Sequence, residues 1–184
     1  VQAEWLVQFA QLGSIFAKHR FGVDAPKVGL LSIGEEPGKG DSLRKETYSL
    51  LLEQGDAINF VGNVEGRDVM ADTADVVVTD GFTGNVVLKT LEGGMRTVIR
   101  GLLEAFGSDE RYRPHAEALM PALMPVYETL DPETYGGAML LGVDGVCIIS
   151  HGSSSERAIV NAIGVARDMV EADVVGEMAS AIGA

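Results

Sequence analysis

The first residues that could do chemistry form the segment Asp80-Gly81-Phe82-Thr83-Gly84-Asn85, which joins an apolar run to an amphipathic stretch. We expect a helix to begin near Asn85, and the two glycines before it let backbone N–H groups approach an anion. The pattern therefore predicts a phosphate site that uses Asp80, Gly81, Thr83 and Gly84. A plain strand-to-helix turn capped by Asn85 explains the same residues equally well. The segment matches neither the P-loop nor the dinucleotide-binding glycine motif.

A second segment of this kind, His151-Gly152-Ser153-Ser154-Ser155-Glu156, follows another apolar run. Ser153 and Glu156 have the spacing of a capping box at a helix start. The hydroxyl groups and the N–H groups there suit a phosphate oxygen, and His151 could act as an acid, a base or a hydrogen-bond donor. A structural cap with a packed histidine fits equally well. Because no carboxylate partner for His151 is evident, a Ser-His-Asp triad is less favoured than an anion site.

Basic side chains follow two of the apolar runs. Lys39, Arg44 and Lys45 come after the first run, and Arg67 comes after the second. Each could reach a phosphate across the strand ends, although the usual place for such a side chain is the solvated surface.

Four apolar runs without polar alternation must position these segments, and they lie at 28–34, 58–62, 74–79 and 145–150. Such runs are typical of strands buried on both faces of a parallel sheet. Between the first two, residues 41–54 read as a crossover helix with Asp41 or Ser42 as N-cap. The class is therefore a doubly wound α/β fold, in which the loops at the carboxyl ends of the strands are expected to converge.

From Asn85 to Phe106 a long amphipathic helix is expected, and residues 118–127 form a second apolar stretch bent by two prolines. Arginines at 96, 100, 111 and 113 give this region local positive charge. The pair could contact anionic lipid, although most amphipathic helices pack in a core or at a dimer interface.

Composition narrows the classes of function. The chain has 184 residues, a hydrophobic share of 46% and a formal net charge of −13. These values indicate one globular domain and disfavour nucleic-acid binding, which needs a basic face. The single cysteine, Cys147, is expected in the core and excludes an internal disulfide, which favours a cytosolic location. The histidines at 19, 115 and 151 lie in separate elements, and no Cys/His spacing fits a zinc site.

Taken together, five ordered motifs resemble the C-terminal part of the PlsX family of phosphate:acyl-carrier-protein acyltransferases; they span residues 28–36, 58–68, 74–90, 135–138 and 151–154. The resemblance implies a three-layer α/β/α fold like that of isocitrate and isopropylmalate dehydrogenases and of phosphotransacetylases. It implies transfer of a long acyl chain from acyl carrier protein to inorganic phosphate, giving acyl phosphate for phospholipid synthesis. It also implies a homodimer, and neither a metal nor an organic cofactor.

The resemblance assigns roles as well. His151 or Asn85 would stabilise the oxyanion or position phosphate, Lys45 or Arg67 would clamp its charge, and Ser153 and Ser154 would bind it beside the 80–85 segment. Residues 96–130 correspond to a helical hairpin that contacts the inner face of the bacterial membrane peripherally.

On this interpretation residues 1–184 are part of one domain, and the chain, which opens inside an amphipathic helix at Val1, is expected to lack an N-terminal portion with a glycine-rich loop. The alternatives are a short-chain phosphotransacetylase-like enzyme and an inactive membrane-binding or dimerisation fragment.

Overall fold

The computed structural model describes residues 1–130, 132–150, 152 and 154–183. The helices are α1 (Ala3–Phe21), α2 (Ser42–Glu53), α3 (Gly81–Gly107), α4 (Arg113–Leu130), α5 (Pro132–Tyr135), α6 (Glu156–Glu171) and α7 (Val174–Ile182), with 3-10 turns at Gly55–Ala57 and Gly66–Met70. The strands are β1 (Val28–Leu31), β2 (Phe60–Val64), β3 (Val76–Val78), β4 (Ala138–Met139) and β5 (Ile148–Ile149).

Three of the four predicted strands form the expected parallel sheet. Its order is β2-β1-β3, so both neighbours of β1 run parallel to it. The crossover helix is also confirmed: α2 begins at Ser42, and the Asp41 side chain caps it by accepting from the N–H of Arg44. The chain is thus an α/β protein with a small parallel sheet.

The fourth predicted strand does not join this sheet. β5 pairs antiparallel with β4, and together they form a separate two-stranded ribbon. Gly142 and Gly145 between them have positive φ angles of 78° and 159°, which let the chain reverse tightly. The prediction of one sheet for all four runs was wrong because the glycines around Asp144 mark a hairpin, which a reading by apolar runs alone overlooks.

Cys147 shows the consequence for burial. Since the ribbon is covered on one face only, its side chains alternate: Val146 and Ile148 pack against a core cluster, while Cys147 is exposed. The expectation that Cys147 lies in the core was therefore wrong.

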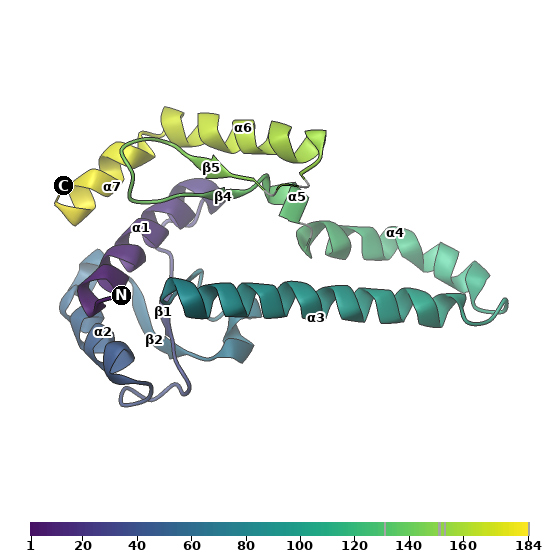
Figure 1. Ribbon diagram of the computed structural model, residues 1–184, viewed down its shortest axis with the longest axis horizontal. Helices are drawn as coiled ribbons and strands as arrows, with labels where there is room; N and C mark the ends of the chain where they lie inside the picture. The colour runs from purple at the N-terminus through teal and green to yellow at the C-terminus, as the bar shows by residue number, and fades with distance from the viewer. Residues whose placement is uncertain (131, 151, 153, 184) are drawn as a thin grey trace.

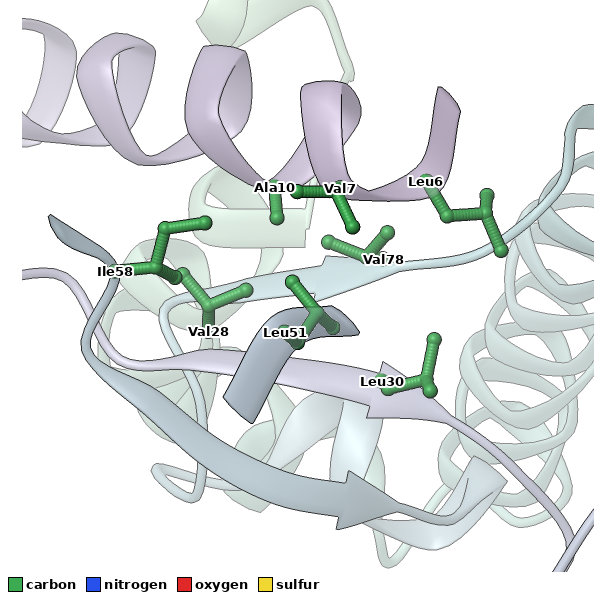
Figure 2. Close-up of a cluster of buried hydrophobic side chains, with 8 residues drawn as sticks. All are labelled: Leu6, Val7, Ala10, Val28, Leu30, Leu51, Ile58 and Val78. Carbon is green, nitrogen blue, oxygen red and sulfur yellow. The ribbon is translucent and has the colours of Figure 1, made fainter. Parts of the chain in front are cut away.

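Helix α1 connects the two apolar clusters of the protein. Leu6, Val7 and Ala10 pack on the sheet with Val28, Leu30, Leu51, Ile58 and Val78 (Figure 2). Further along the same helix, Leu12 joins a second cluster with Val165 and Met169 of α6 and Val174 and Met178 of α7. The sheet and the C-terminal helices are therefore held together through α1 (Figure 1).

The long helix α3 starts at the sheet and extends away from it, and α4 contacts α3 (Figure 1). Among the described residues, no helix is both long enough and apolar enough to cross a membrane.

Candidate functional site

The carboxyl ends of β1, β2 and β3 meet at one edge of the parallel sheet, and side chains from the following loops bind one another there. Asn63, at the end of β2, donates from Nδ2 to the backbone oxygen of Glu36 at 2.9 Å. Arg67 Nη2 lies 2.9 Å from Glu35 Oε1. Three of the four loops predicted to converge are therefore neighbours of the sheet edge, whereas the loop after β5 belongs to the separate ribbon.

The segment 80–85 forms the start of α3. The helix begins at Gly81, four positions before the predicted start, because the Asp80 side chain caps it. Asp80 Oδ1 accepts from the N–H of Thr83 at 2.9 Å, and Oδ2 accepts from the Thr83 hydroxyl at 2.7 Å. Asp80, not Asn85, is therefore the N-cap of this helix, and its carboxylate also complements the helix dipole.

Arg44 of α2 also binds the Asp80 carboxylate that caps α3. Its Nη2 atom donates to Asp80 Oδ2 and lies 3.2 Å from both Thr79 Oγ1 and Thr83 Oγ1. Its Nη1 atom donates to Asp41 Oδ2 at 3.1 Å. The guanidinium group thus joins the cap of α2, the end of β3 and the first turn of α3.

The environment of Asp80 stabilises its charged form. The backbone N–H of Thr83, the Thr83 hydroxyl and the Arg44 guanidinium all donate to the carboxylate and hold its pKa far below the usual range, against the opposing effect of burial. Asp80 is therefore ionised at neutral pH, and the positive charge of Arg44 compensates it.

Two backbone N–H groups at the start of α3 are available to bind a ligand. Within the described part of the chain, the backbone N–H groups of Gly81 and Phe82 have no acceptor, whereas Thr83 donates to Asp80 Oδ1 and Gly84 donates to the Asp80 backbone oxygen. N–H groups in the first turn of a helix are a common anchor for an anion. Asn85 is the fifth residue of the helix, just after this turn, and its side chain is exposed.

Within the described residues, neither predicted clamp forms a hydrogen bond or an ion pair with this turn. Lys45 is exposed on α2, one position after Arg44. Arg67 lies in the turn Gly66–Met70, where its guanidinium faces Glu35 at 2.9 Å, Glu65 at 3.2 Å and Asp68 at 4.0 Å. These three carboxylates raise the pKa of Arg67, with the Glu35 hydrogen bond contributing most.

The second predicted site lies only partly within the described residues. His151 and Ser153 lie outside the described residues, and Ser154 precedes the N-cap of α6. That cap is Ser155, whose Oγ accepts from the N–H of Ala158 at 3.4 Å. The predicted capping box includes Ser153, which lies outside the described residues, and the observed N-cap of α6 is Ser155.

The motif 135–138 has a structural explanation. Gly136 has a φ angle of 80°, and a Cβ atom there would lie 2.4 Å from the backbone nitrogen of Ala162. Its carbonyl accepts from Ser150 Oγ at 2.9 Å. The glycine thus lets the backbone before β4 lie directly against α6.

Arg44 is the residue whose importance sequence reasoning missed. In the sequence it is one of three cations near a strand end, with Lys39 and Lys45, and the family resemblance favours Lys45 as the clamp. The available signal was the i, i+3 spacing of Asp41 and Arg44, which lets the N-cap Asp41 pair with Arg44 in the first turn of α2. Among the described residues, no cluster of three His, Cys, Asp or Glu side chains could hold a metal.

These features define an α/β protein with a charge-compensated helix start at the carboxyl edge of a parallel sheet. Residues 1–177 match the model of the family described as fatty acid synthesis protein, and the chain belongs to this family, which is the PlsX family.

Curated relatives carry the name phosphate acyltransferase. The chain is 51% identical to the one from Halothermothrix orenii, over 94% of the chain and 52% of the relative. It is 50% identical to the one from Elusimicrobium minutum, over 94% of the chain and 50% of the relative. For Bacillus pumilus the identity is 48%, over 93% of the chain and 51% of the relative. The chain thus spans about half the length of the curated relatives it matches.

Proposed function

We propose that this chain carries part of a phosphate acyltransferase, which transfers a long fatty acyl group from acyl carrier protein to inorganic phosphate. The product is an acyl phosphate for phospholipid synthesis. The names of relatives that are about half identical to this chain support the activity, and the family's role in fatty acid synthesis supports the donor. Among the structural observations, the start of α3 supports it most directly.

Phosphate would accept hydrogen bonds from the N–H groups of Gly81 and Phe82, where the dipole of the long helix favours an anion. The Arg44–Asp80 pair helps, because an uncompensated Asp80 carboxylate would repel phosphate from the same turn. Thr83 and Gly84 shape this turn, and Asn85 can offer its amide at the rim. Ser153 and Ser154 would bind phosphate from the start of α6.

The reaction needs no nucleophile from the protein. A phosphate oxygen attacks the thioester carbonyl carbon, the new C–O bond forms and the C–S bond breaks. The sulfur of the carrier's prosthetic group leaves as a thiolate and takes up the proton that the attacking hydrogen phosphate gives up. Asn85 or His151 would stabilise the developing oxyanion, and Lys45 would attract phosphate to the sheet edge. Arg67 would bind phosphate after exchanging its contacts with Glu35, Glu65 and Asp68 for it. No metal or organic cofactor enters this scheme.

The helices within residues 96–130 favour a long acyl chain and a peripheral membrane contact. Exposed apolar side chains occupy both helices: Val98, Leu102 and Leu103 on α3, and Leu119, Leu123, Met124 and Val126 on α4. Arg96, Arg100 and Arg113 are exposed beside them. We infer that this surface rests on anionic headgroups at the cytoplasmic face of a bacterial membrane. The exposed stripe Ile159, Val160 and Ile163 on α6 supports a homodimer.

The experiment uses a chimera in which this chain replaces the matched half of the Halothermothrix orenii relative. It is supplied with palmitoyl-loaded acyl carrier protein and phosphate, and acyl phosphate is trapped with hydroxylamine. A chimera that folds and forms no acyl phosphate contradicts the proposal. Faster reaction with an acetyl donor would instead identify a short-chain phosphotransacetylase-like enzyme.

Two substitutions at Gly81 test the phosphate site separately. Gly81→Pro removes one N–H donor while keeping the helix start, because proline is favoured at the first helical position and Asp80 is already extended, with φ −71° and ψ 157°. Gly81→Ala keeps the donor, and its added Cβ meets no atom within 4 Å. We expect the KM for phosphate to rise about tenfold in the proline variant only. Equal KM values would exclude this turn as the phosphate site.

A further inference from the structure

Three buried side-chain oxygens near the carboxyl ends of β1 and β2 have no hydrogen-bond partner within the described part of the chain. They are Ser32 Oγ, Thr47 Oγ1 and Asn63 Oδ1. Thr47 is fully buried and Asn63 is 7% exposed, so the two side chains are closed to bulk solvent. Native proteins leave few such oxygens unpaired, because each loses its hydrogen bonds to solvent when it is buried. The three oxygens therefore need an explanation in the fold.

The strand register places Ser32 and Asn63 on the same face of the sheet. Asn63 is the partner of Leu30 in the parallel pairing of β1 and β2, and paired side chains point to the same face. The ladder continues one residue beyond β1, since the N–H of Ser32 donates to the Val64 oxygen at 2.8 Å. Ser32 follows Leu30 by two residues, so its side chain also points to this face. Because Leu30 lies in one core cluster with Leu51, this is the face that α2 covers (Figure 2).

Helix α2 brings Thr47 to the same place. It connects two parallel strands, so it runs from the carboxyl edge of the sheet back towards the amino edge. Thr47 comes four residues before Leu51, which places it on the same helix face and about 6 Å closer to the carboxyl edge. Arg44 comes earlier still, and a Cβ atom on Gly40 would lie 2.7 Å from Arg44 Cβ and 2.8 Å from Ser32 Oγ. The three oxygens therefore converge between the first turns of α2 and the strand ends.

The chemistry of the three oxygens matches one water molecule. The Nδ2 atom of Asn63 donates to the Glu36 backbone oxygen at 2.9 Å, which fixes the amide so that Oδ1 is the atom left as an acceptor. The Ser32 and Thr47 hydroxyls can each donate or accept. A water molecule can donate to Asn63 Oδ1 and to one hydroxyl while it accepts from the other. These are three hydrogen bonds, the usual number for a buried water.

A bound cation fits this position less well. All three oxygens are uncharged, and the Arg44 side chain and the start of α2 both contribute positive potential close by. Water carries no net charge, so this potential does not oppose it. The electrostatics therefore favour water over a monovalent cation.

We propose that Ser32, Thr47 and Asn63 bind one buried water, which joins α2 to the ends of β1 and β2. The same Asn63 side chain holds the loop 33–40 through the Glu36 oxygen, so the water also fixes this loop at the sheet edge. The inference rests on buried polar atoms inside the fold, and it does not depend on the proposed catalytic activity.

A double-mutant cycle tests whether the two hydroxyls share a water. Thr47→Val keeps the shape of the side chain and removes its hydroxyl, and Ser32→Ala removes the other one. In urea unfolding, we expect each single variant to lower the folding equilibrium constant about tenfold. The double variant should lose clearly less than the hundredfold of independent sites, because the first substitution already disturbs the shared water. A hundredfold loss, or a Thr47→Val variant more stable than the native protein, overturns the proposal.

Thr90→Val is the matched control, because Thr90 is an exposed threonine inside α3 and undergoes the same exchange of hydroxyl for methyl. We expect it to change the folding equilibrium constant by less than about threefold. Circular dichroism verifies that each variant folds.

Two measurements on the native protein keep the test decisive if a variant does not fold. Proton NMR should show a nuclear Overhauser effect between a long-lived water and the Thr47 methyl group, and its absence overturns the proposal. Urea unfolding should have the same midpoint in potassium chloride and in choline chloride at equal ionic strength. A midpoint that rises only with potassium would assign these oxygens to a cation and overturn the proposal as well.

Discussion

Arg44 and Asp80 form an ion pair that is nearly closed to solvent, with exposed side-chain fractions of 12% and 15%. The two residues come from different elements, since Arg44 lies in the first turn of α2 and Asp80 caps α3. The pair therefore joins two helix starts at the carboxyl edge of the sheet. It also leaves the candidate phosphate turn without an uncompensated charge.

Loss of the arginine should destabilise the protein. Arg44→Met leaves the Asp80 carboxylate enclosed without its cation, and we expect the free energy of unfolding to fall by about 2–4 kcal/mol. Lys45→Met is the matched control, because Lys45 is the exposed neighbour on the same helix and should cost less than about 0.5 kcal/mol. Urea unfolding monitored by circular dichroism measures both. Equal losses in the two variants would show that the pair does not stabilise the fold.

Acid should remove the contribution of Asp80 to the free energy of unfolding in a defined pH window. The pKa of its carboxyl is lowered in the folded state, so its stabilising effect is complete above the unfolded pKa of about 4 and declines as the pH falls below that value. We therefore expect the difference in the free energy of unfolding between the native protein and Asp80→Asn (the stability gap) to be constant from pH 7 to pH 5. The gap should narrow between pH 4 and pH 3 in urea titrations. A gap that widens in acid would mean that Asp80 is protonated in the folded protein.

The parallel sheet and its crossover helix could be predicted because they depend on local patterns. Apolar runs without alternation identify strands buried on both faces, and Asp41 before an amphipathic stretch identifies the start of α2. The pairing of β5 could not be predicted from its apolar run, because a short run fits a parallel or an antiparallel neighbour equally. Only the two glycines that flank the turn before it, Gly142 and Gly145, carried that information.

The helix start at residues 80–85 was predicted at the level of the segment but not of the atom. Residues 80–85 do form a helix start at the sheet edge, yet which residue caps it depends on Arg44, which lies 36 positions earlier in the chain. Similarly, Lys45 and Arg44 are adjacent cations in the sequence, and only the rotation of α2 decides which one faces Asp80. Such choices are made by tertiary packing, so residue spacing alone does not determine them.

The close contact at Gly136 predicts a position-specific cost of adding a methyl group. Gly136→Ala must accept a φ angle of 80° and a Cβ atom 2.4 Å from the Ala162 nitrogen, so we expect a loss of about 2–4 kcal/mol. Gly101→Ala in α3 is the matched control, because nothing lies within 4 Å and alanine favours a helix by about 0.5–1 kcal/mol. The midpoint temperature of thermal unfolding should therefore fall for Gly136→Ala and rise for Gly101→Ala. A tolerated Gly136→Ala would contradict the packing of this segment on α6.

The surface of α3 and α4 leads to a prediction about membranes. If the exposed leucines enter the headgroup region, Leu119→Glu and Leu123→Glu should each reduce cosedimentation with anionic vesicles about tenfold, because each removes one buried leucine side chain. Raising the salt concentration should weaken binding of the native protein too, since Arg96, Arg100 and Arg113 contribute through screened attraction. Leu52→Glu replaces an exposed leucine on α2, outside these two helices, so this variant should bind as the native protein does. Binding that survives both α4 substitutions would assign the membrane contact to another surface and leave the α3–α4 surface free for a protein partner.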